Sequence, residues 1–294
     1  MGGIVDFSKT LEGIGAGVLE ARKRAGVQGV VGEDGMEYCA KCKEPLMLAL
    51  HFTGSIAEKI GDTRYVPRNC KCMREMFAAE DAALAKEKLK AEIHQRKVNG
   101  LKSEKYRLST FDKDDGRNPK IRRMCERYVS KRGEMIDGNF GLAFLGGNGG
   151  GKTFWASCIA NGLIEAGSTV LMTTLTKLIQ ELNADYGEFR EEIMRKIRYV
   201  DFLVLDDYGA ERGTEFSLEQ AFEIIDTRYN AGKPLIITAN LTEETLKNPP
   251  NMNYGRSFSR IVEMCPAMIR VEGERREEIA AEKRKALAEL LRGE

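Results

Sequence analysis

Long apolar segments are missing from this 294-residue sequence. No run approaches the roughly eighteen apolar residues that a membrane-spanning helix requires. The first residues, MGGIVDFSKT, contain neither a basic segment nor an apolar signal core. Gly2 would suit N-myristoylation, but Asp6 stands where that motif requires Ser or Thr. We therefore expect a cytoplasmic protein with no membrane partner.

The sequence also lacks an excess of positive or negative charge, because its net charge at pH 7 is only +1. Electrostatic steering of the whole molecule towards nucleic acid is therefore not expected. One stretch departs from this balance: residues 86–107 contain eight Lys or Arg against three Glu. A solvated helix face is the simpler interpretation of such a run, and contact with nucleic acid is the alternative. With 42% hydrophobic residues, the chain can bury a core and is long enough for about two domains.

A disulfide framework is not expected, because the seven cysteines are odd in number and four of them are clustered. Cys39 and Cys42 form one close pair, and Cys70 and Cys72 form a second pair after 27 intervening residues. Two such pairs suit a tetrahedral four-thiolate Zn²⁺ site, in which the metal replaces a core too small to fold alone. His51 could replace one thiolate, and four reduced structural cysteines are the alternative to a metal site.

The region around the cysteine pairs is expected to contain a weak helix, strand-like patches and one long helix. Residues 1–36 have apolar residues at roughly helical spacing but many glycines, which predicts one weak helix and a loose tail. Strand-like patches lie between the cysteine pairs. Residues 73–106 lack proline and are rich in Ala, Glu, Lys, Leu and Met, which predicts a long helix interrupted near residues 99–100. The polar, turn-rich segment 112–119 is the expected boundary of a second domain.

The second domain contains the phosphate-loop pattern G-x-x-x-x-G-K-[ST] in the segment GLAFLGGNGGGKTF, residues 141–154. Backbone N–H groups at the start of a helix, together with the helix dipole, bind anions. Lys152 would reach the β- and γ-phosphates of a nucleotide, and the Thr153 hydroxyl would ligate Mg²⁺. An ordinary glycine turn between strand and helix is the alternative. The predicted nucleotide-binding set is Gly146, Gly147, Asn148, Gly149, Gly150, Gly151, Lys152, Thr153, Phe154 and Asp206.

Strand and helix patterns alternate after this loop. Continuous apolar strands separated by helices predict an α/β fold, with a parallel sheet covered by helices on both faces. Ligands of such sheets bind at the carboxyl ends of the strands, where Gly146, Asp206 and Asn240 all fall. The expected strands are residues 142–145, 169–173, 200–205, 234–238 and 267–271, and the expected helices are 175–184, 188–198, 218–231 and a charged C-terminal helix.

The side chains at these strand ends predict catalysis as well as binding. Asp206 follows an apolar strand and would hold the water shell of Mg²⁺. Asp207 would orient or deprotonate an attacking water, although a loop or helix-capping carboxylate is the alternative. Asn240 would hydrogen-bond that water or the γ-phosphate, and an ordinary turn residue is its alternative.

The sequence resembles the DnaC-type helicase loaders, a branch of the AAA+ ATPases that also includes transposition helper ATPases. The resemblance rests on GGNGGGKT, VDFLVLDDYGAE, PLIITAN and the segment GRSFSRI at residues 255–261, and it covers about residues 107–276. It implies an AAA+ type phosphate-loop NTPase that hydrolyses ATP to ADP. It also implies an arginine finger that completes a neighbouring subunit's site, so the chain would self-assemble. Arg260 matches that position best, with Arg256 one helical turn earlier.

Other segments match the family more loosely. Residues 106–111 resemble the lead-in that packs near the adenine. Many AAA+ proteins have Glu where this chain has Asp207, and the shorter side chain implies slow turnover. Gly273, with Arg275 or Arg276, matches the family's last glycine turn, although the residues GERR depart from the usual pattern.

A zinc knuckle ahead of a helical linker resembles helicase loaders of phage or Gram-positive type. The resemblance implies that the N-terminal domain binds the replicative hexameric helicase and that the AAA+ domain binds single-stranded DNA. The expected domains are residues 1–36 (flexible or weakly helical), 37–110 (zinc-binding, helical and helicase-binding) and 111–294 (AAA+ ATPase). Candidate DNA-phosphate contacts are Lys177, Arg195, Lys196 and Arg198.

Two other functions compete with helicase loading. A transposition helper would bind duplex DNA and a transposase. A nucleotide-gated binding module would change shape between ATP and ADP with negligible turnover.

Overall fold

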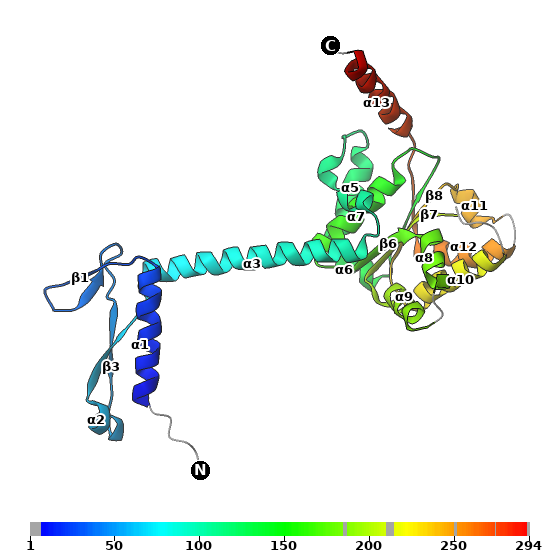
Figure 1. Cartoon of the computed structure of the whole chain (residues 1–294). Coiled ribbons are helices and arrows are strands. Elements are labelled where there is room, and N and C mark those ends of the chain that lie inside the picture. The colour runs from blue at the N-terminus through cyan, green and yellow to red at the C-terminus, as the bar shows by residue number, and fades with distance from the viewer. Residues whose placement is uncertain (1–6, 185–186, 210–214, 250–251, 274, 293–294) are drawn as a thin grey trace. The chain divides into compact units, whose positions relative to one another are not determined.

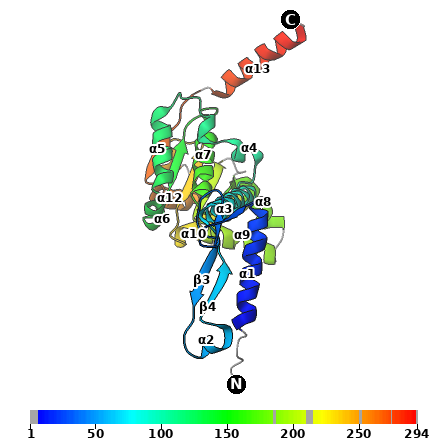
Figure 2. The ribbon, with the colours of Figure 1, turned by 90° about the vertical axis from the view of Figure 1, so that its left-hand side faces the viewer.

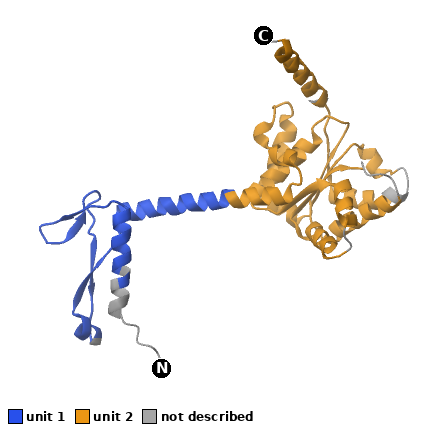
Figure 3. Ribbon diagram, viewed as in Figure 1, with its two compact units in different colours: residues 1–90 blue, residues 91–294 orange. Residues whose placement is uncertain are grey.

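A computed structural model describes residues 7–184, 187–209, 215–249, 252–273 and 275–292. The chain forms two compact units, residues 1–90 and residues 91–294 (Figure 3). Helix α3 (Lys71–Gly100) contributes residues to both units. The expected division into domains 1–36, 37–110 and 111–294 stays a prediction, and residues 1–6 of it lie outside the described residues.

The described part of the first unit combines two helices and the first part of α3 with two small antiparallel sheets. Figures 1 and 2 show β3 and β4 side by side with α1 next to them. The core of this unit is small, because Cys39, Leu46, Cys70 and Met73 are its buried members among the described residues. The elements are α1 (Phe7–Arg24), β1 (Gly29–Val31) paired with β2 (Glu37–Cys39), α2 (Ser55–Ile60), and β3 (Met47–His51) paired with β4 (Thr63–Pro67).

The β1–β2 hairpin was not among the elements expected from the sequence. The connecting turn contains Asp34-Gly35, and Gly35 adopts a positive φ of 76°. Asp-Gly is a strong turn signal because glycine reaches positive φ without a steric cost. The Asp34 side chain also accepts a hydrogen bond from the Met36 backbone N–H at 3.0 Å.

The second unit is built on a five-stranded sheet with the order β6-β7-β8-β5-β9, in which all neighbouring strands are parallel. The expected α/β class is therefore confirmed. Each strand lies within a few residues of its predicted position, because a strand buried on both faces is a continuous apolar run. The strands are β5 (Leu142–Leu145), β6 (Val170–Thr174), β7 (Phe202–Tyr208), β8 (Leu235–Ala239) and β9 (Ala267–Arg270).

Helices cover both faces of this sheet, as expected. Along β5, Leu142 and Phe144 pack on the face of α7, while Ala143 and Leu145 pack on the opposite face. This alternation follows from the two-residue period of a strand. Figure 1 shows α5 and α7 on one side of the strands and α8, α10 and α12 on the other. The helices are α5 (Pro119–Ser130), α7 (Lys152–Glu165), α8 (Leu175–Ala184), α9 (Glu188–Tyr199), α10 (Glu215–Asn230) and α12 (Met252–Met264).

Helix α3 ends at Gly100 because the chain there meets the edge of the sheet. A Cβ on Gly100 would lie 2.2 Å from the Val170 carbonyl oxygen, so only glycine fits. Lys102 donates its backbone N–H to the Met172 carbonyl at 3.0 Å, and Leu101 is fully buried. The helix is thus interrupted near residues 99–100, as predicted, at the place where the chain packs against β6. The remaining elements are α4 (Glu104–Leu108), η1 (Phe111–Lys113), α6 (Arg132–Asp137), α11 (Glu243–Lys247) and α13 (Arg275–Arg292).

Candidate functional site

The phosphate loop connects β5 to α7 and depends on glycine at several positions. Gly146, Gly149 and Gly151 have φ values of 133°, 91° and 97°, which favour glycine. A Cβ on Gly146 would lie 2.4 Å from the Val271 carbonyl oxygen, and a Cβ on Gly150 would lie 2.7 Å from the same atom. The loop therefore lies directly against the end of β9. Its glycines leave room for an anion to approach the backbone.

Lys152 is the first residue of α7, directly after this loop, and only 6% of its surface is exposed. Its Nζ donates hydrogen bonds to the carbonyls of Gly146 (3.0 Å) and Gly147 (2.6 Å) and to Oδ1 of Asn240 (2.7 Å). Burial lowers the pKa of Lys152, and the nearby carboxylate of Asp207 opposes that shift. Lys152 and Asn240, two of the predicted site residues, are therefore in direct contact.

Asp206 lies near the end of β7 with 3% of its surface exposed. Its Oδ1 accepts hydrogen bonds from the hydroxyls of Thr153 (2.8 Å) and Thr238 (2.6 Å), and its Oδ2 accepts one from the Tyr106 hydroxyl (3.0 Å). The hydroxyl of Thr153 and the carboxylate of Asp206 are therefore adjacent. Oxygen ligands of this kind are those that Mg²⁺ prefers, so the residues present fit the expected ion.

Asp207 follows in a left-handed backbone conformation, with φ of 53°. The pairing of β7 with β8 shifts between Leu205 and Tyr208, and the Asp207 backbone N–H donates to Oγ1 of Thr238 at 2.9 Å. Asp207 is exposed to solvent. Desolvation by the surrounding atoms, followed by the charge of Asp206, raises the pKa of the Asp207 carboxyl. A raised pKa favours a carboxylate as a proton acceptor near neutral pH.

A pocket of about 300 Å³ collects most of the predicted residues. Gly146 and Gly147 instead line an adjoining hollow of about 600 Å³ that shares Asn240. Asp206 is buried, and its Oδ1 bonds the hydroxyl of Thr153, which lines the first pocket. That pocket is lined by Lys105, Ser109, Asn148, Gly149, Gly151, Lys152, Thr153, Phe154, Asp207, Asn240, Arg276 and Ile279.

Several residues at this site were not expected or were only loosely indicated. Arg276 lines the pocket, and its Cβ lies 3.4 Å from a Cβ built on Gly149. The side chain of Arg275 lies outside the described residues. Thr238 was missed, although a signal was present: it stands two residues before Asn240, so a strand period places both on one face. Tyr106 belongs to the segment expected near the adenine, but no pattern indicated its bond to the carboxylate.

The two candidate arginine fingers lie in a different place. Arg256 and Arg260, both on α12, stack on the ring of Phe222 at 4.3 and 4.6 Å from its centre. Arg260 also pairs with Asp226 at 2.6 Å and is about a quarter exposed. Both arginines line an open hollow of about 760 Å³ that is separate from the phosphate-loop pocket. The finger role stays a prediction.

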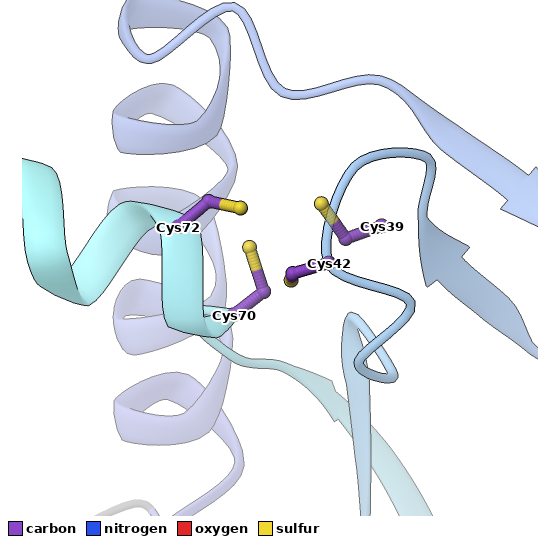
Figure 4. A group of neighbouring side chains, drawn as sticks. All are labelled: Cys39, Cys42, Cys70 and Cys72. Atoms are coloured by element: carbon purple, nitrogen blue, oxygen red, sulfur yellow. The ribbon is translucent and has the colours of Figure 1, made fainter.

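The predicted zinc ligands of the first unit form one cluster (Figure 4). The Sγ atoms of Cys39, Cys42, Cys70 and Cys72 all lie within 4.8 Å of one another. Zn–S bonds of about 2.3 Å in a tetrahedron place sulfurs about 3.8 Å apart, so this cluster fits a four-thiolate site. A hydrogen bond from the Cys72 backbone N–H lowers the pKa of Cys42 to about 6, while burial raises the pKa of Cys72 to about 12. Four neighbouring thiolates repel one another unless a cation joins them.

His51 is not part of this cluster among the described residues. It lies exposed at the end of β3, where its Nδ1 is 3.0 Å from the Thr63 hydroxyl. The alternative in which His51 replaces a cysteine is therefore not supported, because the strand carries it away from the turns that hold the thiols.

The candidate DNA contacts lie on α8 and α9. Lys177, Arg195, Lys196 and Arg198 are all exposed. Lys196 pairs with Glu192 on the same helix at 2.6 Å, so part of its charge is already balanced. Their role in binding DNA stays a prediction.

Together, the parallel sheet, the phosphate loop, the acidic residues at the end of β7 and Asn240 define a nucleotide-binding domain of the phosphate-loop type. Residues 123–248 match the family described as IstB-like ATP binding protein. This match lies within the second unit and confirms, for that domain, the resemblance found in the sequence.

Three curated proteins illustrate the relationship. The uncharacterized protein YdaV of Escherichia coli (strain K12) is 30% identical over 144 residues, which are 48% of this chain and 58% of YdaV. A putative insertion sequence ATP-binding protein of Sinorhizobium fredii is 35% identical over 100 residues, 34% of this chain and 33% of that protein. The replicative helicase loader DnaC of Escherichia coli (strain K12) is 27% identical over 118 residues, 38% of this chain and 48% of DnaC. The chain thus spans about a third to three fifths of these relatives.

Among solved structures, a DnaC helicase loader is 23% identical with a TM-score of 0.49, and the similarity covers 58% of this chain and 100% of that structure. None of the described helices is both long enough and apolar enough to cross a bilayer.

Proposed function

We propose that this protein is an ATP-hydrolysing loader of a replicative helicase. The observation that supports nucleotide use is the convergence of Lys152, Thr153, Asp206 and Asn240 at the carboxyl ends of three adjacent strands. The observation that supports loading, rather than another AAA+ function, is the four-cysteine unit that precedes the ATPase-type domain.

The chain's own residues can perform the steps of ATP hydrolysis. Backbone N–H groups of the phosphate loop hold the phosphates, and Lys152 contributes a positive charge beside them. A Mg²⁺ ion held by Thr153 and Asp206 would supply positive charge to the phosphate oxygens. Asp207 accepts a proton from water as the water oxygen bonds to the γ-phosphorus and the bond to the β–γ bridging oxygen breaks. The products are ADP and inorganic phosphate.

The remaining partners are assigned by the chemistry of each surface. Leu48, Ile56 and Tyr65 in the first unit are exposed by 43%, 48% and 58%, which suits the helicase as a protein partner. The exposed bases Lys177, Arg195, Lys196 and Arg198 on α8 and α9 would contact phosphates of single-stranded DNA. Arg260 would complete the site of a neighbouring copy.

Lys152→Ala tests the nucleotide function. Removing charge-assisted hydrogen bonds, each worth about 1.5–3 kcal/mol, should weaken ATP binding by about tenfold or more. A titration with a fluorescent ATP analogue measures the effect, and Lys177→Ala, which removes an exposed lysine, is the control. Equal affinity and equal ATPase rates in Lys152→Ala and the unaltered protein would contradict the nucleotide function.

Affinity purification from the native host tests the loader function. We expect a hexameric replicative helicase to co-purify, and we expect tighter binding to single-stranded than to duplex DNA. The similarity to an insertion sequence ATP-binding protein supports one competing function, transposition help. Preference for duplex DNA and co-purification of a transposase would favour that function. ATP binding with no measurable turnover, even with DNA and partner present, would favour a nucleotide-gated module.

A further inference from the structure

The acidic pair, Asp206 and Asp207, lies in an irregular part of the sheet. The pairing of β7 with β8 is regular up to Leu205 and resumes at Tyr208. Between the partners of these two residues, β8 has only Thr238. Two acidic residues therefore lie opposite a single threonine. An extra residue in one strand re-aims side chains locally, and such bulges are frequent next to active sites.

The hydroxyl of Thr238 bonds to both members of the acidic pair. It donates to Oδ1 of Asp206 at 2.6 Å and accepts the backbone N–H of Asp207 at 2.9 Å. Thr238 is fully buried, so water does not replace these bonds. The bond to the N–H also supports Asp207 in its left-handed conformation, which is unfavourable for a residue with a Cβ.

The other oxygen of Asp206 is held from a different part of the chain. Tyr106, with 6% of its surface exposed, donates its hydroxyl to Oδ2 of Asp206 at 3.0 Å. Tyr106 is itself anchored, because its carbonyl accepts the side-chain N–H of Asn161 at 2.8 Å. The same Asn161 amide also bonds the carbonyl of Ser109, which lines the nucleotide pocket. Both oxygens of Asp206 are thus oriented by buried hydroxyl groups.

We propose that Thr238 and Tyr106 are positioning residues that aim the acidic pair at its ion and water. This inference rests on the proposed ATPase function. A carboxylate that is free to rotate would adopt several orientations, of which only some serve the ion. Thr238 also connects the pair to Asn240, which follows β8 and accepts from Lys152. The end of β8 therefore sets the positions of four side chains relative to one another: Lys152, Asn240, Asp206 and Asp207.

A matched set of substitutions separates positioning from packing. Thr238→Val keeps the size of the side chain but removes the hydroxyl, and Thr238→Ser keeps the hydroxyl. Tyr106→Phe removes the second donor. Thr173→Val is the control for buried strand threonines, because the Thr173 hydroxyl has no hydrogen-bond partner in the described part of the chain. Tyr128→Phe is the control for buried tyrosines, because its hydroxyl bonds the Phe140 carbonyl instead.

Three measurements are made on each full-length variant: ATP affinity in EDTA, the Mg²⁺ concentration that gives half of the ATP-dependent thermal stabilisation, and kcat. Loss of groups that orient metal ligands lowers metal affinity or activity by about 10- to 100-fold. We therefore expect Thr238→Val and Tyr106→Phe to raise the half-saturating Mg²⁺ concentration and lower kcat by about this factor. ATP affinity without Mg²⁺ should stay within about twofold, because the phosphate loop is unchanged. Thr238→Ser and both controls should match the unaltered protein.

The outcomes distinguish this inference from the proposed function. If the unaltered protein shows no Mg²⁺-dependent ATP binding, the proposed function fails. If it binds and hydrolyses ATP but Thr238→Val and Tyr106→Phe behave like their controls, the positioning role is wrong. If Thr238→Ser is as defective as Thr238→Val, packing rather than the hydroxyl is responsible, which also overturns the role. Should Thr238→Val fail to fold, the comparison of Tyr106→Phe with Tyr128→Phe still decides.

Discussion

Asp207 is a non-glycine residue with a positive φ, a property that it shares with Lys43 and Asn139 in the described part of the chain. Its φ of 53° is more accessible to Asp and Asn than to most residues with a Cβ. Many AAA+ proteins have Glu at the position of Asp207, and the shorter reach of Asp implies slow turnover. The bulge adds a physical reason for Asp at this position, because its short polar side chain tolerates the left-handed conformation.

Asp207→Asn should preserve ATP binding and lower hydrolysis by about 100-fold or more, because the amide keeps the shape but cannot accept a proton. Asn also tolerates the left-handed backbone, so folding should be unaffected. The ATPase rate and the affinity for a fluorescent nucleotide are measured side by side. A rate near that of the unaltered protein would show that another group accepts the proton.

The same residue predicts a pH dependence. Desolvation and Asp206 raise the pKa of Asp207 above its ordinary value. The base is active when ionised, so kcat should fall as the pH falls through this raised pKa. The acidic limb of the kcat profile should therefore lie above that of an ordinary carboxylate. Asp207→Asn should remove this limb, and a limb that persists in the variant would assign it to another group.

At the scale of elements, Arg228 of α10 forms side-chain hydrogen bonds with the backbone at the end of α9 and just before β7 and β8. Its side chain is fully buried, and its guanidinium donates only to backbone carbonyls among the described residues. A rigid fork of five donors can reach several carbonyls that no other side chain would satisfy together. The accepting carbonyls belong to Ile197, Val200, Asp201 and Pro234.

Arg228→Met should destabilise the second unit by about 3 kcal/mol or more, because each buried carbonyl left without a donor costs about 1–3 kcal/mol. Trp155 is the single tryptophan and is buried in this unit, so its fluorescence reports urea unfolding there. Arg195→Met removes an exposed arginine from α9 and serves as the control. An unchanged unfolding midpoint in Arg228→Met would mean that water or a shift of the backbone satisfies the carbonyls.

For the whole molecule, the two units should respond differently to metal removal. We expect one zinc ion per chain, held by Cys39, Cys42, Cys70 and Cys72. The buried core around them is small, so metal binding supplies much of the folding free energy of residues 1–90. A chelator should therefore reduce the circular dichroism of this unit and leave the Trp155 unfolding transition unchanged. Elemental analysis that finds no stoichiometric metal in protein purified without chelator would contradict this expectation.

Self-assembly can be tested by mixing two inactive variants. Arg260→Ala subunits keep an intact phosphate loop, whereas Lys152→Ala subunits keep the arginine. If Arg260 acts on a neighbour's γ-phosphate, mixed assemblies should regain part of the ATPase activity that each variant lacks alone. Mixing that restores nothing, although the variants demonstrably co-assemble, would rule out a role across subunits. Normal hydrolysis by assembled Arg260→Ala would make its contacts with Phe222 and Asp226 structural, and Arg256 would be tested next.

The strands of the parallel sheet, most of the helices that cover it, the phosphate loop and the four-cysteine set could all be predicted from the sequence. These features depend on short-range patterns, such as apolar runs, glycine spacing and paired cysteines, that are complete within a few residues. The predicted strand 200–205 nevertheless stopped before the bulge, since β7 continues to Tyr208. An apolar pattern ends where the acids begin, although the backbone continues in the sheet.

The tertiary structure was needed to show which side chains orient the acidic pair and that Arg276 lines the pocket at the phosphate loop. Tyr106 and Asp206 are 100 residues apart, and Thr238 and Asp206 are 32 apart. Their contacts depend on the strand order, which places β8 between β7 and β5, and on a one-residue irregularity in register. Likewise, Arg276 reaches the pocket because Val271 and Gly273 carry the chain past the loop glycines. Such contacts are set by the packing of distant segments, which no local pattern of residues encodes.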